Sequence, residues 1–397
     1  MKKGWTYKKL GEVCEILNGF AFKSSNYVPE GVRVIRITNV QKGYVEDNDP
    51  KYYPYETKDE LSRYLLKEGD MLLSLTGNVG RVAILGKSFL PAYLNQRVAC
   101  IRVRKGVELD LSFLFHLLYS QKFEDDCIKS SNGAAQLNMS TVWLASYLIP
   151  VPPLSEQQSI VDYLDSAFAK IDAMKANAQK ALNEAQALFQ ASLKEMLEPK
   201  EGWEEKKLSD IGELKNGMNF NKNESGYNVH ILGVGDFGNL FQIKDTDSLQ
   251  TISLNSKPSE EYILKNEDIV FVRSNGNKNL VGRCVLIYVG NEHCSFSGFC
   301  IRLRKTTNEI DACYLTHFLK TEDARKKLVG NGANISNLNQ KVLNEFVVSY
   351  PPLTEQQSIV ATLDSLKSKV DQLQENYDKI SQECDALKQA ILRQVFE

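Results

Sequence analysis

The chain has 397 residues, enough for two or three domains that each bury a core of their own. Its formal net charge of −2 at pH 7 argues, for the chain as a whole, against a nucleic-acid-binding protein. No apolar run approaches the roughly 20 residues that span a membrane, and the start MKKGWTYKKL lacks the apolar segment of a signal peptide, so we expect a cytoplasmic protein with no membrane partner.

The local distribution of charge is less restrictive than the total. Residues 1–150 carry a net charge of +4 and residues 201–350 carry −1, whereas 151–200 and 351–397 carry −2 and −3. Acidic residues are therefore concentrated in two short segments. Charge permits nucleic-acid binding by the rest of the chain without requiring it.

The eight cysteines are scattered and include no C-x-x-C pair. His293, Cys294 and Cys300 come nearest to a metal cluster, but their spacing fits no common zinc module. We predict buried or incidental reduced thiols and no metal.

Residues 1–150 show the patterns of a mixed α/β domain. Short runs rich in β-branched residues predict strands at 32–40, 70–75, 80–85 and 98–103. Apolar residues at helical spacing predict a single helix over 109–129.

A long helix is predicted to follow the double proline at 152–153 and to run to about residue 197. Ser155 is expected as its N-cap, with Gln158 as the capping-box partner. Steps of three and four residues give a predicted seam of Leu164, Ala167, Ile171, Met174, Ala178, Ala181, Ala185 and Leu188.

The second half of the chain repeats the first at an offset close to 198 residues. The matched segments are GWTYKKLGEVCEILNG (4–19) with GWEEKKLSDIGELKNG (202–217), LKEGDMLL (66–73) with LKNEDIVF (264–271), ACIRVRKG (99–106) with FCIRLRKT (299–306), and PPLSEQQSIV (152–161) with PPLTEQQSIV (351–360). The chain is therefore a tandem of two homologous halves.

The same elements are predicted again in the second half. Strands are expected at 228–234, 268–274, 283–289 and 299–304, with a helix over 312–328. A second long helix should run to about 396, with Thr354 as N-cap and Gln357 as its partner. Its predicted seam is Leu363, Leu366, Val370, Leu373, Tyr377, Ile380, Cys384, Leu387 and Ile391.

The order of the segments predicts how the long helices pair. The first ends where the second α/β domain begins, and the second starts where that domain ends, so the two should run antiparallel. We expect an α+β chain of two homologous α/β domains joined by an antiparallel coiled coil, with an approximate two-fold axis. The expected boundaries are 1–151, 152–200, 201–350 and 351–397.

Apparent catalytic motifs do not hold. GRVAILGKS at 80–88 has five residues between its glycines, where a P-loop has four, and these glycines flank a predicted strand. GVGDFG at 233–238 is not followed by a long helix, so we read it as a turn beside a strand. An amino-methyltransferase tetrad is missing, the nearest being DPKY at 49–52, and His116 and His317 are predicted to pack or cap.

Clusters of arginine, asparagine and glutamine carry a different indication. These side chains form paired hydrogen bonds with guanine and adenine edges, although singly they are also common in turns. As sets they predict contacts with double-stranded DNA. The candidates are Arg33, Arg36, Thr38, Asn39, Gln41, Thr76, Asn78, Arg81, Asn95, Gln96 and Arg97, then Asn219, Asn221, Lys222, Arg273, Ser274, Asn275, Asn277, Lys278 and Arg283.

Two α/β domains that are each followed by a Pro-Pro-Leu-(Ser/Thr)-Glu-Gln-Gln helix resemble the Type I restriction specificity subunits, often called HsdS. The resemblance covers essentially the whole chain. It is most specific in PPLSEQQSIVDYLD (152–165) and PPLTEQQSIVATLD (351–364), supported by LKEGDMLLSLTGNVGRVAIL. The second half departs from that last pattern, with four extra residues before Gly282, so contacts cannot be carried over turn by turn.

The resemblance implies that the α/β domains are target recognition domains, each reading one part of a split DNA sequence, with the coil as ruler. It implies a non-catalytic chain that binds two methyltransferase subunits, joined by restriction subunits. S-adenosylmethionine, ATP and Mg²⁺ would then act in those partners, and none in this chain.

Two alternatives remain. A Type IIB system would have the same architecture, with methylation and cleavage in one partner chain, and genome neighbours would distinguish it. A coiled-coil scaffold whose end domains bind protein would give no gel shift with DNA.

Overall fold

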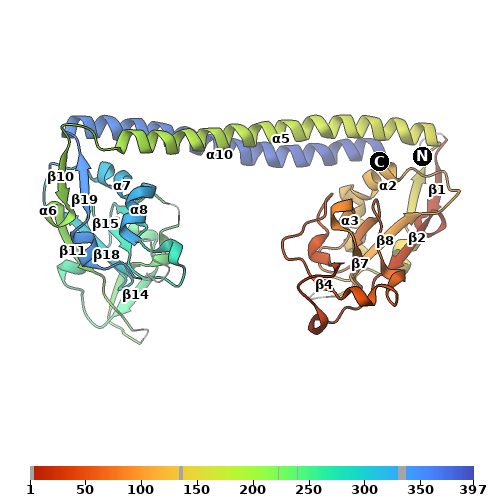
Figure 1. Cartoon of the computed structure of the whole chain (residues 1–397), viewed down its shortest axis with the longest axis horizontal. Coiled ribbons are helices and arrows are strands. Elements are labelled where there is room, and N and C mark those ends of the chain that lie inside the picture. The colour runs from red at the N-terminus through yellow and green to blue at the C-terminus, as the bar shows by residue number, and fades with distance from the viewer. Residues whose placement is uncertain (1–3, 134–136, 222, 239, 330–336) are drawn as a thin grey trace. The chain divides into compact units, whose positions relative to one another are not determined.

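The structure is a computed structural model that describes residues 4–133, 137–221, 223–238, 240–329 and 337–397, apart from the side chains of Lys58, Lys278 and Val329. The chain forms two compact units, Met1–Gln179 with Tyr377–Glu397, and Lys180–Asn376. Each unit holds one α/β domain and a part of each long helix, α5 (Leu154–Leu197) and α10 (Leu353–Phe396), which are drawn unbroken in Figure 1.

Two sheets form the centre of the first unit. The larger, antiparallel throughout, has the order β2 (Cys14–Asn18), β8 (Val98–Val103), β5 (Met71–Ser74), β6 (Val82–Ile84). The smaller has the order β4 (Tyr52–Tyr53), β3 (Val32–Ile35), β7 (Ala92–Leu94), with β3 and β7 parallel. All four predicted strands of this half are confirmed, with shorter bounds for three of them.

Alternation along the strands divides the first unit into three layers. Met71 and Ile101 pack with Phe113 and Phe123 of the helices, whereas the next residue, Leu72, packs with the smaller sheet. The helices of this layer are α2 (Leu111–Leu118) and α3 (Gln121–Ser130). Two short helices, α1 (Leu10–Val13) and α4 (Thr141–Ser146), lie beside an antiparallel two-stranded ribbon of β1 (Thr6–Lys9) and β9 (Leu148–Val151). Period-two strands with both faces buried thus form the middle layer.

The single helix predicted over 109–129 is wrong, because the chain breaks between α2 and α3. The hydroxyl of Ser120 accepts a hydrogen bond from the amide of Phe123 at 3.3 Å and so begins a new helix. The helix predicted over 312–328 breaks in the same way into α7 (Ala312–Lys320) and α8 (Glu322–Val329), where Thr321 accepts from the amide of Ala324 at 3.2 Å.

The second unit repeats this plan. Its larger sheet has the order β11 (Gly212–Asn216), β18 (Cys300–Lys305), β15 (Ile269–Val272), β16 (Cys284–Ile287), β13 (Gln242–Ile243). The smaller sheet has the order β14 (Thr251–Leu254), β12 (Tyr227–Leu232), β17 (Cys294–Phe296). The short helices α6 (Leu208–Ile211) and α9 (Gln340–Asn344) and the ribbon of β10 (Glu204–Lys207) and β19 (Val347–Tyr350) correspond to α1, α4, β1 and β9. The strands predicted for this half are confirmed.

The structure corrects one of the sequence matches by two residues. Arg102 donates two hydrogen bonds to the buried Asp70, at 2.7 and 2.6 Å, and Arg304 does the same to Asp268 at 2.8 and 2.6 Å. Arg102 therefore corresponds to Arg304 and not to Arg302. The error arose because both strands read Cys-Ile-Arg-x-Arg, and a shift of two keeps each side chain on the same face.

The N-caps predicted at Ser155 and Thr354 are wrong, because both long helices begin directly after the double proline. The amides of Glu156 and Gln157 already donate to the carbonyl of Pro153, at 2.9 and 3.0 Å. Proline fixes φ near the helical value, so the second proline can open the first turn.

Within the first unit, α5 and α10 pack antiparallel. Asp172 contacts Lys388 at 2.5 Å and Lys175 contacts Asp385 at 3.5 Å. Residue numbers therefore increase along α5 where they decrease along α10. Of the predicted seam, Leu164, Ile171 and Leu363 are buried, and Val370, Leu373, Tyr377, Ile380 and Ile391 are half-buried.

Met174, Leu188 and Leu387 were placed in the seam wrongly, since 59%, 60% and 48% of them is exposed. In α5 the second inward-facing position of each heptad follows the first by four residues and not three. Phe168, Leu182 and Phe189 lie there in place of Ala167, Ala181 and Leu188, and Lys175 lies there in place of Met174. In α10 the buried residue near the end is Leu392.

Candidate nucleic-acid interface

Three turns of the first domain meet at one edge because of how its strands pair. Ile35 at the end of β3 lies beside Leu94 at the end of the parallel strand β7, and Ser74 at the end of β5 lies beside Val98, the first residue of antiparallel β8. The amide of Leu75 donates to the carbonyl of Arg97 at 2.9 Å. The three polar clusters of this half, predicted from separate stretches, are therefore neighbours.

The first two clusters enclose a shared hollow of about 340 Å³. It is lined by Ile37, Thr38, Gln41, Thr76, Gly77 and Asn78. Beside it, the guanidinium of Arg81 donates to the side-chain oxygen of Gln41 at 2.7 Å and joins the two turns.

Five of the predicted side chains at this edge are engaged inside the domain. Arg33 pairs with Asp47 and lies over the rings of Tyr52 and Phe89, and Arg36 contacts Asp49 at 3.2 Å. Asn39 donates to the carbonyl of Glu46, Thr76 donates to Asn138, and Asn95 accepts from the amide of Arg97. These contacts hold the turns in shape.

Four other side chains at the same edge are exposed and make no side-chain hydrogen bond to the part of the chain that the structure describes. They are Thr38, Asn78, Gln96 and Arg97. Arginine and amide groups held this way can donate to and accept from base edges. They are the strongest candidates for contact with DNA in the first domain.

The second domain forms the corresponding edge. Leu232 of β12 lies beside Phe296 of the parallel strand β17, and the amide of Arg273 donates to the carbonyl of Phe299 at 2.8 Å. The guanidinium of Arg273 also donates to the carbonyl of Gly298 at 3.3 Å. The turns after β12, β15 and β17 therefore converge as their counterparts do.

Several predicted residues of this second edge shape turns. The side-chain oxygens of Asn275 and Asn277 accept from the amides of Asn277 and Asn279, at 2.7 and 3.1 Å, and Asn221 contacts Glu224. Asn219 is exposed. Lys222 and the side chain of Lys278 lie outside the described residues.

An exposed aromatic residue at this edge was missed by sequence reasoning. Phe299 is 61% exposed and occupies the position of Arg97 in the first domain. The carbonyl of Phe299 accepts from the first amide after β15, as the carbonyl of Arg97 accepts from the first amide after β5. Phe299 begins the strand predicted over 299–304, and within a predicted strand a phenylalanine is indistinguishable from a core residue. The strand register was the only information that could have revealed it.

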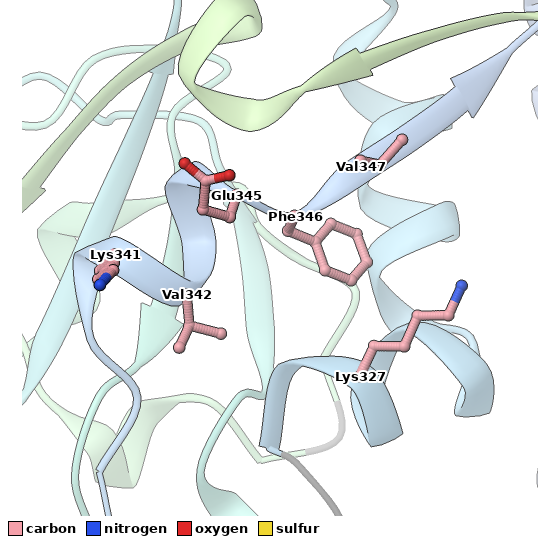
Figure 2. Close-up of a pocket in the computed structure, with 6 residues that line it drawn as sticks. All are labelled: Lys327, Lys341, Val342, Glu345, Phe346 and Val347. Atoms are coloured by element: carbon pink, nitrogen blue, oxygen red, sulfur yellow. The ribbon is translucent and has the colours of Figure 1, made fainter.

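Away from these edges, each unit carries an exposed apolar position beside a hollow. In the second unit the hollow measures about 540 Å³ and lies between α8, α9 and β19, with the six side chains drawn in Figure 2, among them Phe346 and Val347. In the first unit, Leu148 occupies the place of Val347 and lines a hollow of about 950 Å³. Leu148 is 58% exposed and Val347 is 43% exposed.

Comparison with known proteins identifies the family. The family model for the Type I restriction modification DNA specificity domain matches residues 2–184 and again 200–382. The chain belongs to this family. It holds two specificity domains, one in each half of the repeat.

Curated relatives match over the full length. The StySPI specificity subunit of Salmonella potsdam is 25% identical and the EcoKI specificity subunit of Escherichia coli K12 is 24% identical, each match covering 100% of this chain and 89% of the relative. A solved chain from work on assembly and conformational transition of the type I R-M system has a TM-score of 0.73 at 19% identity, covering 100% and 98% of the two chains. The HsdS subunit of Thermoanaerobacter tengcongensis gives 0.55 at 20%, covering 100% and 97%, and both likenesses concern the fold.

In both specificity domains a buried histidine joins the domain to its long helix. Nε2 of His116 lies 2.8 Å from Asp165 Oδ1, and Nε2 of His317 lies 3.4 Å from Asp364 Oδ1. Burial lowers the pKa of His116, and Asp165 opposes that effect. These histidines pack at a junction, as predicted.

Neither of the motifs that resemble nucleotide-binding loops joins a strand to a long helix in the structure. Strand β6 lies between Gly80 and Gly86, and residues 233–238 follow β12 as a short 3₁₀ turn, Val234–Asp236. Cys294 and Cys300 are buried thiols whose pKa burial raises to about 12. Over the described ranges, no cluster of three His, Cys, Asp or Glu side chains could hold a metal ion, and no helix is long and apolar enough to cross a membrane.

Proposed function

We propose that this chain is the DNA-specificity subunit of a Type I restriction-modification complex and that each specificity domain reads one part of a split target. The observation that carries the proposal is the repeated edge, where three polar turns converge in each of two domains of this family. The edges differ in their exposed residues, with Arg97 in the first and Phe299 in the second. Two different surfaces on one scaffold suit two different half-sites.

The proposed partners are double-stranded DNA, two methyltransferase subunits and restriction subunits. Two copies of the methyltransferase fit a chain that presents equivalent surfaces twice, including the hollows beside Leu148 and Val347. The relatives are named as subunits of Type I restriction enzymes, which favours this system over a Type IIB one. We further propose that the paired helices set the number of unread base pairs between the half-sites.

Catalysis in this proposal belongs to the partners, with S-adenosylmethionine in the methyltransferase and ATP and Mg²⁺ in the restriction subunit. The fold of the glycine motifs supports a non-catalytic role, because neither joins a strand to a long helix as a nucleotide loop does. We propose no cofactor for this chain.

A binding experiment separates this function from that of a protein scaffold. The chain assembled with its methyltransferase should shift a duplex carrying its methylation motif at concentrations at least 1,000-fold lower, by the usual ratio for specific binding, than a random duplex. Equal affinity for both duplexes, or none for either, would support the scaffold.

A further inference from the structure

The second unit has a cavity of about 1000 Å³ that is lined by a group of cationic side chains. The cavity borders the candidate reading edge, which is the edge formed by the turns after β12, β15 and β17. It lies between α7, α8, the turn at Gly238 and the parts of α5 and α10 in that unit. Arg283, Lys320 and Arg325 line it together. Of these, sequence reasoning singled out only Arg283.

The three cationic groups are held close to one another by backbone carbonyls. Nε of Arg283 and Nη2 of Arg325 both donate to the carbonyl of Asn279, at 3.3 and 2.9 Å. Nη1 of Arg283 donates to Gly238 O at 2.8 Å, and Nζ of Lys320 donates to Leu240 O at 2.8 Å. Two guanidinium groups that share one acceptor must lie within a few ångströms of each other.

The cluster is short of negative charge. Lys320 and Arg325 form no ion pair with any carboxylate of the described residues, and Nε of Arg325 is buried without a partner. Burial lowers the pKa of both groups, and repulsion from Arg283 lowers each further. Partly desolvated like charges of this kind are stabilised when an anion binds between them.

The carboxylates of the cavity lie on α10, and two of the three already have partners. Asp364 contacts His317 at 3.4 Å, and Asp371 pairs with Lys367, which leaves Glu375. Five cationic side chains line the cavity against these three carboxylates: Lys244, Arg283, Lys320, Arg325 and Lys367. The net charge of the lining is therefore positive.

The first unit provides an internal comparison. Counting from the N-caps Ser120 and Thr321, Glu124 takes the place of Arg325 and Tyr119 takes the place of Lys320. Glu124 pairs there with Lys42 at 2.6 Å, so this position is neutralised within the domain. The pair Lys320 and Arg325 is thus replaced by Tyr119 and Glu124 in the first unit, where the cavity of about 860 Å³ beside Tyr119 is lined instead by Lys42, Arg81, Lys175 and Arg393 with Asp385.

We propose that Arg283, Lys320 and Arg325 bind a backbone phosphodiester of DNA beside the half-site read by the second domain. Guanidinium groups match the geometry of phosphate oxygens, and Gly238 and Arg283 connect the cavity directly to the turns of the reading edge. A phosphate contact here would fix position and carry no sequence information. The inference rests on the proposed function, because it requires DNA at that edge.

The test compares salt dependence of binding by the full chain in complex with its methyltransferase. Arg325→Gln and Lys320→Gln should each reduce the slope of log K against log salt by up to about 0.9 and weaken target and random duplex alike. Lys326→Gln is the matched control, since Lys326 is an exposed neighbour that pairs with Glu322 on its own helix. Arg325→Lys keeps the charge and should keep the slope, which separates charge from folding.

A second arm locates the anion on DNA. Single phosphates of the target are replaced in turn by neutral methylphosphonates. At one position this replacement should lower the affinity of the wild-type complex, whereas the affinity of the Arg325→Gln complex should not fall further at that position. If both Gln variants keep the wild-type slope, the phosphate site is wrong. If both Gln variants no longer bind the methyltransferase but keep the slope, the cavity binds an acidic segment of a protein, and this result also contradicts the phosphate site. A wild-type complex that does not prefer its target would instead refute the proposed function.

Discussion

The side-chain oxygen of Gln356 accepts a hydrogen bond of 2.8 Å from the amide of Asp311, and its nitrogen donates to the carbonyls of Glu309 and Pro351, each at 2.8 Å. Gln157 makes the same three contacts with Asp110, Glu108 and Pro152 in the first unit. This fully buried amide ties the start of each long helix to the loop before α7 or α2. It explains why a glutamine follows the Pro-Pro-Leu-(Ser/Thr)-Glu segment in both halves.

Gln356→Leu should lower the free energy of unfolding of the second unit by about 2 kcal/mol, because it leaves a buried amide and two carbonyls without partners. Urea denaturation measures this. The matched control is Gln357→Leu, since Gln357 is exposed one residue further along the helix. Equal losses from the two variants would show that the buried contacts contribute nothing.

Asp268→Asn should destabilise the second unit by about 3 kcal/mol, because the guanidinium of Arg304 would lose the carboxylate that holds it in a largely buried pair. The control is Glu345→Gln, which removes the exposed partner of Lys207 and should change thermal unfolding little. Calorimetry of both variants compares them directly. A larger shift for the exposed pair would reverse this assignment.

Two leucines of α10 test the corrected seam. Leu392 is fully buried and Leu387 is 48% exposed, so Leu392→Lys should cost about 3 kcal/mol through a buried charge, whereas Leu387→Lys should cost little. Thermal unfolding of the two lysine variants gives the comparison. The opposite ranking would restore the heptad predicted from sequence.

Asn78→Ala should relax discrimination at one base pair by about 1 to 3 kcal/mol, since the exposed Asn78 amide is free to contact a base edge. Affinities of the assembled complex for a set of duplexes with single substitutions give the profile. Asn26→Ala, at an exposed turn elsewhere in the domain, should leave that profile unchanged. A uniform loss for all duplexes would make Asn78 a phosphate contact.

Strands and the repeat were predictable because short β-branched runs and matched segments are local features of the sequence. The breaks at Ser120 and Thr321 were not, since a hydroxyl inside an apolar periodicity is compatible with a continuous helix until its cap contact is known. The seam failed by one residue for a similar reason. From Leu164, Ala178 and Ala185 of α5, steps of three and of four both reach apolar side chains, and only packing against α10 decides between them.

The candidate site was predictable in composition but not in arrangement. Arginine and amide clusters were visible in the sequence, yet their convergence depends on parallel pairing between β3 and β7, strands separated by three others along the chain. The inward contacts of Arg33 and Arg36 depend on partners in a distant turn. Lys320 and Arg325 lie on helices where cations are ordinary, so only the fold reveals their cluster.

Methylation sequencing of cells that carry this chain and its methyltransferase tests the central claim most directly. The chain should direct methylation to a motif of two half-sites separated by unread base pairs, and the motif should vanish when the gene is deleted. Exchange of residues 1–150 for the corresponding domain of a relative should change one half-site and leave the other intact, because each specificity domain has its own edge of convergent turns. A motif that is continuous, unaffected by deletion, or altered in both halves by this exchange would contradict a specificity subunit with two independent readers.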